Sequence, residues 1–287
     1  MFSSIPSSAS RAAKSRRPLG MTLAVGWLVT MCIVAVFAPL IAPHGYAEQD
    51  LLARLAPPIF MGGTADHLLG ADHLGRDVLS RLIYAIRVSA IVALAGTVIG
   101  AVLGTLLGVL AAQWGGFFEE AVMALVDVQS ALPFLIFALL IIAFFGNDLV
   151  LFILLLGVQG WERYARLARG LVLDANTRGY ARAARAMGLA EWHVNLVHLA
   201  PNIAGAIAVQ FTINLPETIL LEAGLSFVGL GIQPPMTSLG LMLNESRGHM
   251  VLHWWLAALP AFTIFLTALA ISLLGDSLRD RLDHAND

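Results

Sequence analysis

The sequence predicts an all-α, polytopic membrane protein with six transmembrane helices. Hydrophobic residues make up 58% of its 287 residues, whereas globular proteins average about 45–50%. Charged residues make up only 13%, against a usual share of about 25%, and the mean hydropathy is +0.79. A soluble chain of this length could not bury so much apolar surface. The composition therefore excludes a soluble enzyme, a disordered chain and a collagenous chain.

The first span is predicted over 19–42, after a basic tail at 1–18. The tail carries four basic residues and no acid, and the run that follows holds no charge. That run exceeds the roughly 20 residues that cross a bilayer. A cleavable signal peptide is the alternative, but its apolar region is usually about 7–15 residues long. We therefore expect an uncleaved helix whose tail stays in the cytoplasm.

An extracytoplasmic loop is predicted over 43–87, ending in an interfacial helix over Arg76–Val88. Asp77 and Arg81 stand four residues apart on its polar face, the spacing of a helical ion pair. The other five spans are predicted at 88–112, 121–145, 149–168, 203–225 and 256–275.

The basic residues predict that both termini lie in the cytoplasm. With six spans, twelve of the seventeen Lys and Arg residues fall in cytoplasmic segments, as the positive-inside bias requires. A phosphate-binding P-loop needs a lysine at the start of a helix, and the only lysine, Lys14, lies in the tail. The chain is therefore no P-loop ATPase, and the formal charge of −2 offers no basic surface for nucleic acid.

Four glycines form a stripe along the second span. Gly96, Gly100, Gly104 and Gly108 are spaced by four, so they share one helical face where another helix can approach closely. The partner helix belongs either to this chain or to another one.

A short amphipathic helix is predicted in the cytoplasmic loop between the fourth and fifth spans. Arg178, Arg182 and Arg185 lie on one face, and Gly188 follows at the C-cap position. The opposite face carries Tyr180, Ala183, Ala184 and Met187. These residues suit either docking into a groove of another protein or lying on anionic lipid.

This loop resembles the EAA loop of binding-protein-dependent ABC importers. Ala183, Ala184, Gly188 and Pro201 match that pattern, while Arg182 stands in place of its glutamate. Three longer stretches are similar to the C-type permease of dipeptide, oligopeptide and nickel importers: HLLGADHLGRDVLSRLIYAIRVS from His67, LEAGLSFVGLGIQPP from Leu221 and LLGDSLRDRLD from Leu273. The resemblance implies the MetI-like architecture of type I ABC importer permeases over 88–282.

The resemblance also implies a division of labour in a bacterial or archaeal cytoplasmic membrane. This chain would pair with a second, homologous permease to form the pore, two ABC ATPases would hold ATP and Mg²⁺, and an extracytoplasmic binding protein would deliver di- or oligopeptides. The chain itself would bind no cofactor and catalyse no reaction. The residues implied in coupling to the ATPases are Tyr180, Arg182, Ala183, Ala184, Met187, Gly188 and Pro201. The alternatives are import of nickel or a nickel chelate and, from another class, an ion-coupled secondary transporter or a membrane scaffold without transport activity.

Polar residues inside the spans mark a candidate translocation path. Gln210, Asn214 and Glu217 share one face of the fifth span, which Pro216 is expected to interrupt, and Asp127 lies in the third. Charged groups in the bilayer face protein or water rather than lipid. These residues either line the substrate path or join helices by hydrogen bonds.

A possible metal-ligand cluster lies in the extracytoplasmic loop. His67, Asp72, His73 and Asp77 fall within eleven residues, and such donors suit nickel or zinc. Their spacing matches no diagnostic metal motif, and the helix with its preceding loop explains them. We therefore expect no metal site.

Overall fold

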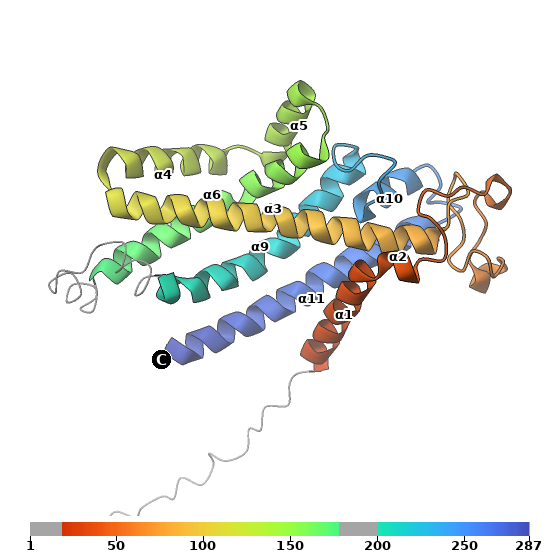
Figure 1. The fold of residues 1–287 in the computed structure, drawn as a ribbon, viewed down its shortest axis with the longest axis horizontal. Helices are drawn as coiled ribbons and strands as arrows, with labels where there is room; N and C mark the ends of the chain where they lie inside the picture. The colour runs from red at the N-terminus through yellow and green to blue at the C-terminus, as the bar shows by residue number, and fades with distance from the viewer. Residues whose placement is uncertain (1–18, 178–199, 287) are drawn as a thin grey trace, which may run out of the picture.

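The computed structural model describes residues 19–177 and 200–286. Every regular element in these ranges is a helix, and the β-type pairing there consists of one isolated bridge between Ala71 and Asp77. The long helices run side by side as a bundle, with the loop before residue 78 gathered at one end (Figure 1). The predicted all-α membrane fold is confirmed. Four helices of the described part are long and apolar enough to cross a membrane, and one bent pair would make a fifth.

The first span is α1 (Leu19–Val36), followed after a bend at Phe37 by the short α2 (Ala38–Ile41). It packs against α11 (Trp255–Asn286), where the indole N–H of Trp27 donates to Thr267 Oγ1 at 3.1 Å. Ala24 is the buried residue of α1. Met31, Val34 and Ala35 are partly buried against the core, and the exposed side of α1 is left for lipid or a partner, as expected of a helix at the edge of a membrane bundle.

The second span is much longer than predicted. α3 (Val78–Trp114) is one continuous helix of 37 residues, so the interfacial helix predicted over Arg76–Val88 and the span predicted at 88–112 join without a break. The sequence between Val78 and Ala95 holds neither proline nor glycine, and the helix propagates through it. At 1.5 Å per residue α3 is about 55 Å long, and its ends extend beyond about 30 Å of hydrocarbon.

The glycine stripe of α3 packs against α6 (Leu149–Thr177) of the same chain, which answers the question that the sequence left open. A Cβ on Gly104 would lie 2.1 Å from the carbonyl oxygen of Trp161, and one on Gly108 would lie 2.3 Å from that of Ala165. Side chains at these positions would force the two backbones apart. The stripe thus sets the distance between α3 and α6.

A sharp break divides the predicted span at 121–145. α4 (Gly116–Ala131) and α5 (Phe134–Phe145) are bent by 96° relative to each other, so together they form either one broken span or a re-entrant loop. Leu132 has extended backbone before Pro133, because proline disfavours helical geometry in the residue that precedes it. The chain turns at this point and opens the side of the bundle beside α6.

The fifth span is α9 (Ala200–Val228), which runs through Pro216. The expectation that Pro216 interrupts this helix is therefore wrong.

The periodicity did not predict α10 (Leu239–Ser246), which begins where Ser238 Oγ accepts from the backbone N–H of Leu241 at 3.1 Å. The largest buried apolar cluster lies where α3, α9, α10 and α11 meet and comprises Val78, Ala85, Ile86, Ala93, Ile219, Ala223, Leu239, Met242, Trp255, Leu256 and Ile264.

The predicted fourth span, 149–168, lies within α6. This helix is long enough to cross a membrane, yet it is not among the apolar helices because charged residues begin at Glu162. How those charges are accommodated determines the chemistry of this side of the bundle.

Candidate translocation path

Three arginines follow one another along α6 at intervals of three residues. Arg163, Arg166 and Arg169, called here the arginine ladder, each meet an acid on another helix. Arg166 lies 3.1 Å from Asp127 and Arg169 lies 2.5 Å from Glu119, both on α4. Opposite charges compensate one another in a setting where an unpaired charge is costly. The ladder therefore lets α6 carry three positive charges beside the apolar helices.

The polar face predicted on α9 meets the first arginine of this ladder. Gln210 Nε2 donates to Asn214 Oδ1 at 3.0 Å, and Arg163 donates to Asn214 Oδ1 at 3.3 Å and to Glu217. Asn214 is buried and fits against Gly160, where a Cβ would approach its amide nitrogen to 3.0 Å. The structure thus brings Gln210, Asn214 and Glu217 together, and it adds Arg163 as a partner of Asn214 and Glu217.

Asp127 lies apart from this group, on α4. Its carboxylate pairs with Arg166, and both side chains are more than half exposed. Asp127 therefore pairs with the second arginine of the ladder, whereas Glu217 of α9 pairs with the first.

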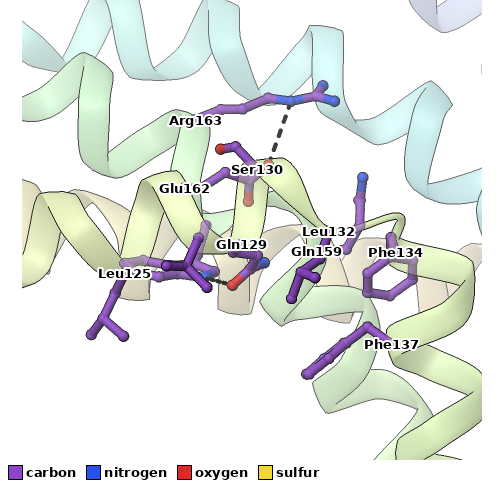
Figure 2. A pocket seen from close by; sticks show the side chains of 11 residues that line it. Leu125, Gln129, Ser130, Leu132, Phe134, Phe137, Gln159, Glu162 and Arg163 are labelled. Atoms are coloured by element: carbon purple, nitrogen blue, oxygen red, sulfur yellow. Dashed lines mark hydrogen bonds and ion pairs between the residues drawn. The ribbon is translucent and has the colours of Figure 1, made fainter.

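A cavity of about 370 Å³ opens at the break between α4 and α5 and extends to α6 (Figure 2). One wall is apolar and includes Leu125, Phe134 and Phe137, and the other carries Glu162 and Arg163. Gln129 links α4 to α6 at the cavity: it accepts a hydrogen bond from Trp161 Nε1 at 2.6 Å and donates one to the carbonyl oxygen of Val158. The cavity thus combines an apolar surface with one acidic and one basic side chain.

Glu162 is the unusual member of this wall. Its side chain is 11% exposed and lies 3.8 Å from Arg163. Its Oε2 atom is buried and has no hydrogen-bond partner among the described residues. A buried carboxylate oxygen without a hydrogen-bond donor is energetically costly, so Glu162 carries an unsatisfied acceptor next to the cavity.

A second charged cluster lies at the end of the bundle near the 42–77 segment. Asp72 accepts from Arg76 Nε at 2.6 Å and from Arg81, and Glu245 of α10 faces the same two arginines at 3.1 and 2.6 Å. We call these four residues the outer charge cluster. Its members are at most 15% exposed. The predicted ion pair between Asp77 and Arg81 is wrong, because Asp77 instead caps α3 by accepting from the N–H of Ser80 at 2.7 Å.

The outer charge cluster keeps Asp72 ionised. Burial raises the pKa of this carboxyl, but the charge of Arg81, the backbone N–H of Arg76 and the charge of Arg76 together outweigh burial and hold the pKa below its usual range. Two carboxylates thus balance two guanidinium groups. The cluster joins the 42–77 segment to α3 and α10.

The implied coupling residues fall outside the described residues, with one exception. Tyr180, Arg182, Ala183, Ala184, Met187 and Gly188 belong to the gap between 177 and 200, and Pro201 lies in the first turn of α9. Their assignment stays a prediction.

Sequence reasoning missed the pairing of the arginine ladder and the position of Glu162. The arginines entered only the count of cytoplasmic basic residues. Their spacing of three was visible in the sequence and indicated one helical face. Their acidic partners stand 39 to 54 residues away, so no local pattern connects them.

Comparison with protein families gives two matches. Residues 104–286 match the family described as binding-protein-dependent transport system inner membrane component. Residues 16–58 match the N-terminal transmembrane domain of oligopeptide transport permease C. Together these two regions cover most of the described chain, and residues 59–103 lie between them.

Curated relatives agree with these families. The chain is 39% identical to a di/tripeptide transport system permease protein of Pseudomonas aeruginosa, over 91% of this chain and 87% of that protein. It is 37% identical to a dipeptide transport system permease protein of Bacillus subtilis, over 89% and 79%. A glutathione transport system permease protein of Pectobacterium atrosepticum is 35% identical, over 92% and 86%.

The fold matches that of a solved transporter. A chain of the MetNI methionine ABC transporter, in an inward-facing conformation, aligns with a TM-score of 0.51 and 22% identity, covering 69% of this chain and 95% of that one. The MetI-like architecture predicted from the resemblance is confirmed at the level of the fold.

Proposed function

Because the chain belongs to the family of binding-protein-dependent transport system inner membrane components, we propose that it forms half of the translocation pore of an ATP-driven importer of di- or oligopeptides. The observation that carries the proposal is the similarity to dipeptide and di/tripeptide permeases, at 37–39% identity over about nine tenths of the chain. A second, homologous permease forms the other half. Two ATPase subunits hold ATP and Mg²⁺, and an extracytoplasmic binding protein delivers the cargo.

The cavity at the α4–α5 break suits a short peptide. A free dipeptide carries one ammonium and one carboxylate group, and the cavity presents Glu162 and Arg163 side by side. The side chain of Glu162 complements the ammonium group, and that of Arg163 complements the carboxylate. The volume of the cavity, about 370 Å³, falls within the range of about 300–1,000 Å³ for small-molecule sites.

The path continues from this cavity along the polar residues of α9. Arg163 joins the cavity to Asn214 and Glu217, and Gln210 extends the same face by one turn. Asp127 borders the path from α4. We assign these residues to transient contacts with the peptide backbone, whose amide groups need polar partners when they leave water.

The test of this proposal begins with purification of the chain from its native membrane in mild detergent and mass spectrometry of everything that co-elutes. A homologous permease and P-loop ATPases are expected. Proteoliposomes containing that complex and its binding protein should take up radiolabelled dipeptide only with ATP inside the vesicles. A lone chain whose transport stops when the proton gradient is collapsed, and is indifferent to ATP, would overturn the proposal.

Glu217→Gln is expected to lower dipeptide uptake at least several-fold while the complex still assembles. The Arg163–Glu217 pair is only about half buried, and such pairs contribute about 0–1 kcal/mol to stability. The substitution removes the charge that holds Arg163 toward α9. Uptake into proteoliposomes and the yield of complex on size exclusion measure the two effects. Glu120→Gln, at an exposed acid of α4, is the control that should leave both unchanged, and an assembly defect alone in Glu217→Gln would assign the pair a structural role.

The cytoplasmic segment 178–201 is proposed to transmit closure of the ATPases to the transmembrane helices, with both chain termini in the cytoplasm. Gly188→Leu is then expected to abolish uptake while membrane insertion and complex formation persist, because the helix could no longer end at the glycine and dock. ATP hydrolysis and peptide uptake are measured on the same proteoliposomes. Gly170→Leu is the matched control, since a Cβ there meets nothing within 4 Å. Normal uptake by Gly188→Leu would refute the coupling role.

A further inference from the structure

The histidines and aspartates that cluster in the sequence before α3 separate in space. Asp72 belongs to the outer charge cluster, and the ring of His73 stacks on that of His249 with centroids 5.8 Å apart. His67 and Asp77 stay together and are joined by His44, a residue from the start of the segment that follows α2. The structure thus assembles a set of three donors that the sequence spacing did not indicate.

We propose that His44, His67 and Asp77 form a Zn²⁺ site that fastens the 42–77 segment to the first turn of α3. The ligand atoms of the three side chains all lie within 4.8 Å of one another. The proposal is independent of what the permease transports, because it concerns a resident ion at the end of the bundle and not a cargo.

The two histidines converge on Asp77, where His67 forms a hydrogen bond with one carboxylate oxygen, which an ion would replace, and His44 approaches the other. His67 Nδ1 lies 3.2 Å from Asp77 Oδ1, and His44 Nδ1 lies 3.9 Å from Asp77 Oδ2. Zn²⁺ binds nitrogen at about 2.0–2.1 Å and carboxylate oxygen at about 2.0–2.2 Å, so two ligand atoms of a tetrahedral site stand roughly 3.4 Å apart. The two observed separations bracket that value. The two imidazole rings also face the same region, with centroids 5.3 Å apart.

One donor atom of this set is buried and unused. His44 Nδ1 is inaccessible to solvent and has no hydrogen-bond partner among the described residues. Its separation from Asp77 Oδ2 is too long for a hydrogen bond. An ion between His44 and Asp77 would satisfy the atom, because both the nitrogen and the oxygen could then ligate it. A bound ion would thus give His44 Nδ1 the partner that no hydrogen bond among the described residues supplies.

The surroundings hold these ligands in position. The backbone N–H of His44 donates to Ser80 Oγ at 3.0 Å, and the backbone N–H of Ser80 donates to Asp77 Oδ2 at 2.7 Å. His67 and Asp77 are 7% and 3% exposed. Such supporting contacts fix the orientation of ligands before the metal arrives.

The donor set favours zinc among the common metals. Two imidazole nitrogens and one carboxylate match the zinc sites in which the protein supplies three ligands and a water supplies the fourth. Calcium and magnesium prefer oxygen ligands throughout. The ligands come from residues 44, 67 and 77, so one ion closes two loops at once and stabilises the segment by restricting the unfolded chain.

The experiment uses the whole complex, purified without a polyhistidine tag, treated with EDTA and titrated calorimetrically with ZnCl₂. One equivalent of Zn²⁺ is expected to bind to this chain. His44→Asn and His67→Asn should each abolish binding of that equivalent at a zinc concentration that saturates the parent complex. His73→Asn, a histidine of the same loop outside the site, is the control and should retain it. Zinc should also raise the unfolding temperature of the parent complex but not that of His44→Asn.

X-ray absorption at the zinc edge on the parent complex gives a readout that does not depend on the variants. A first shell of nitrogen and oxygen with the scattering pattern of two imidazole rings is expected. A spectrum without imidazole ligands would overturn the assignment even if both variants failed to assemble. Absence of zinc binding to the parent complex, or retention of the equivalent by both His44→Asn and His67→Asn, would overturn it as well. Loss in His73→Asn alone would place the ion among His73 and its histidine neighbours and would also refute the site.

Discussion

Replacing Asp72 by Asn is expected to lower the free energy of unfolding by about 3–5 kcal/mol, the usual cost of removing one partner from a buried ion pair. Asp72 contacts both Arg76 and Arg81, whose side chains are 9% and 3% exposed. Glu245 alone would then face two buried guanidinium groups. The loss of unfolding free energy is measured by titrating the chain in mixed micelles with a denaturing detergent.

Asp66→Asn is the matched control for this prediction. Asp66 lies in the same segment and is exposed, so its substitution should change the free energy of unfolding by no more than about 0.5 kcal/mol. Equal losses in the two variants would show that the outer charge cluster contributes nothing specific. Because the pKa of Asp72 is lowered, its stabilising contribution is present throughout the neutral range and is lost only as the pH falls below about 3.8 and through the lowered pKa.

Replacing Gly104 by Leu is expected to disrupt the contact between α3 and α6. A Cβ at this position would lie 2.1 Å from the carbonyl oxygen of Trp161 and 2.8 Å from Tyr164 Cβ. Overpacking usually costs about 1–3 kcal/mol. The loss here should reach or exceed the upper end of that range, because the clashing atom belongs to a helix backbone that cannot rotate away. The free energy of unfolding and the yield of assembled complex measure the effect.

Gly170→Leu serves as the control on the other helix of the pair. A Cβ on Gly170 meets nothing within 4 Å, so the same side chain is accommodated there. Its stability should match or slightly exceed that of the parent, since glycine inside a helix is unfavourable by about 1 kcal/mol relative to good helix formers. Normal stability of Gly104→Leu would show that α3 and α6 can pack at a greater distance than the structure shows.

The position of the apolar helices could be predicted because hydropathy is a local property of the chain. The predicted first and last spans, 19–42 and 256–275, correspond to α1 with α2 and to α11. The effect of proline could not be predicted in the same way. Pro133 separates two helices by a bend of 96°, whereas Pro216 lies inside a continuous helix. The difference depends on tertiary packing around each site, since neighbouring helices can satisfy the backbone groups that a proline frees.

The candidate path was predicted in part, because helical periodicity is also a local property of the chain. Gln210, Asn214 and Glu217 follow a helical period, so their common face was visible before their contacts were known. Arg163 stands 54 residues before Glu217, and only the folded chain shows that the two meet. The Zn²⁺ ligands illustrate the same limit, because His44 lies far from His67 in sequence and joins it through the packing of the segment on α3.

The arginine ladder also has a consequence for the order in which the protein is made. Asp127 and Glu119 precede α6 in the chain, so Arg166 and Arg169 find their acids as soon as α6 leaves the ribosome. Glu217 is synthesised about fifty residues later, so until α9 is made the acidic partner of Arg163 is the adjacent Glu162, 3.8 Å away. A nascent chain that stops before Glu217 therefore lacks the partner on α9 that Arg163 contacts in the folded protein.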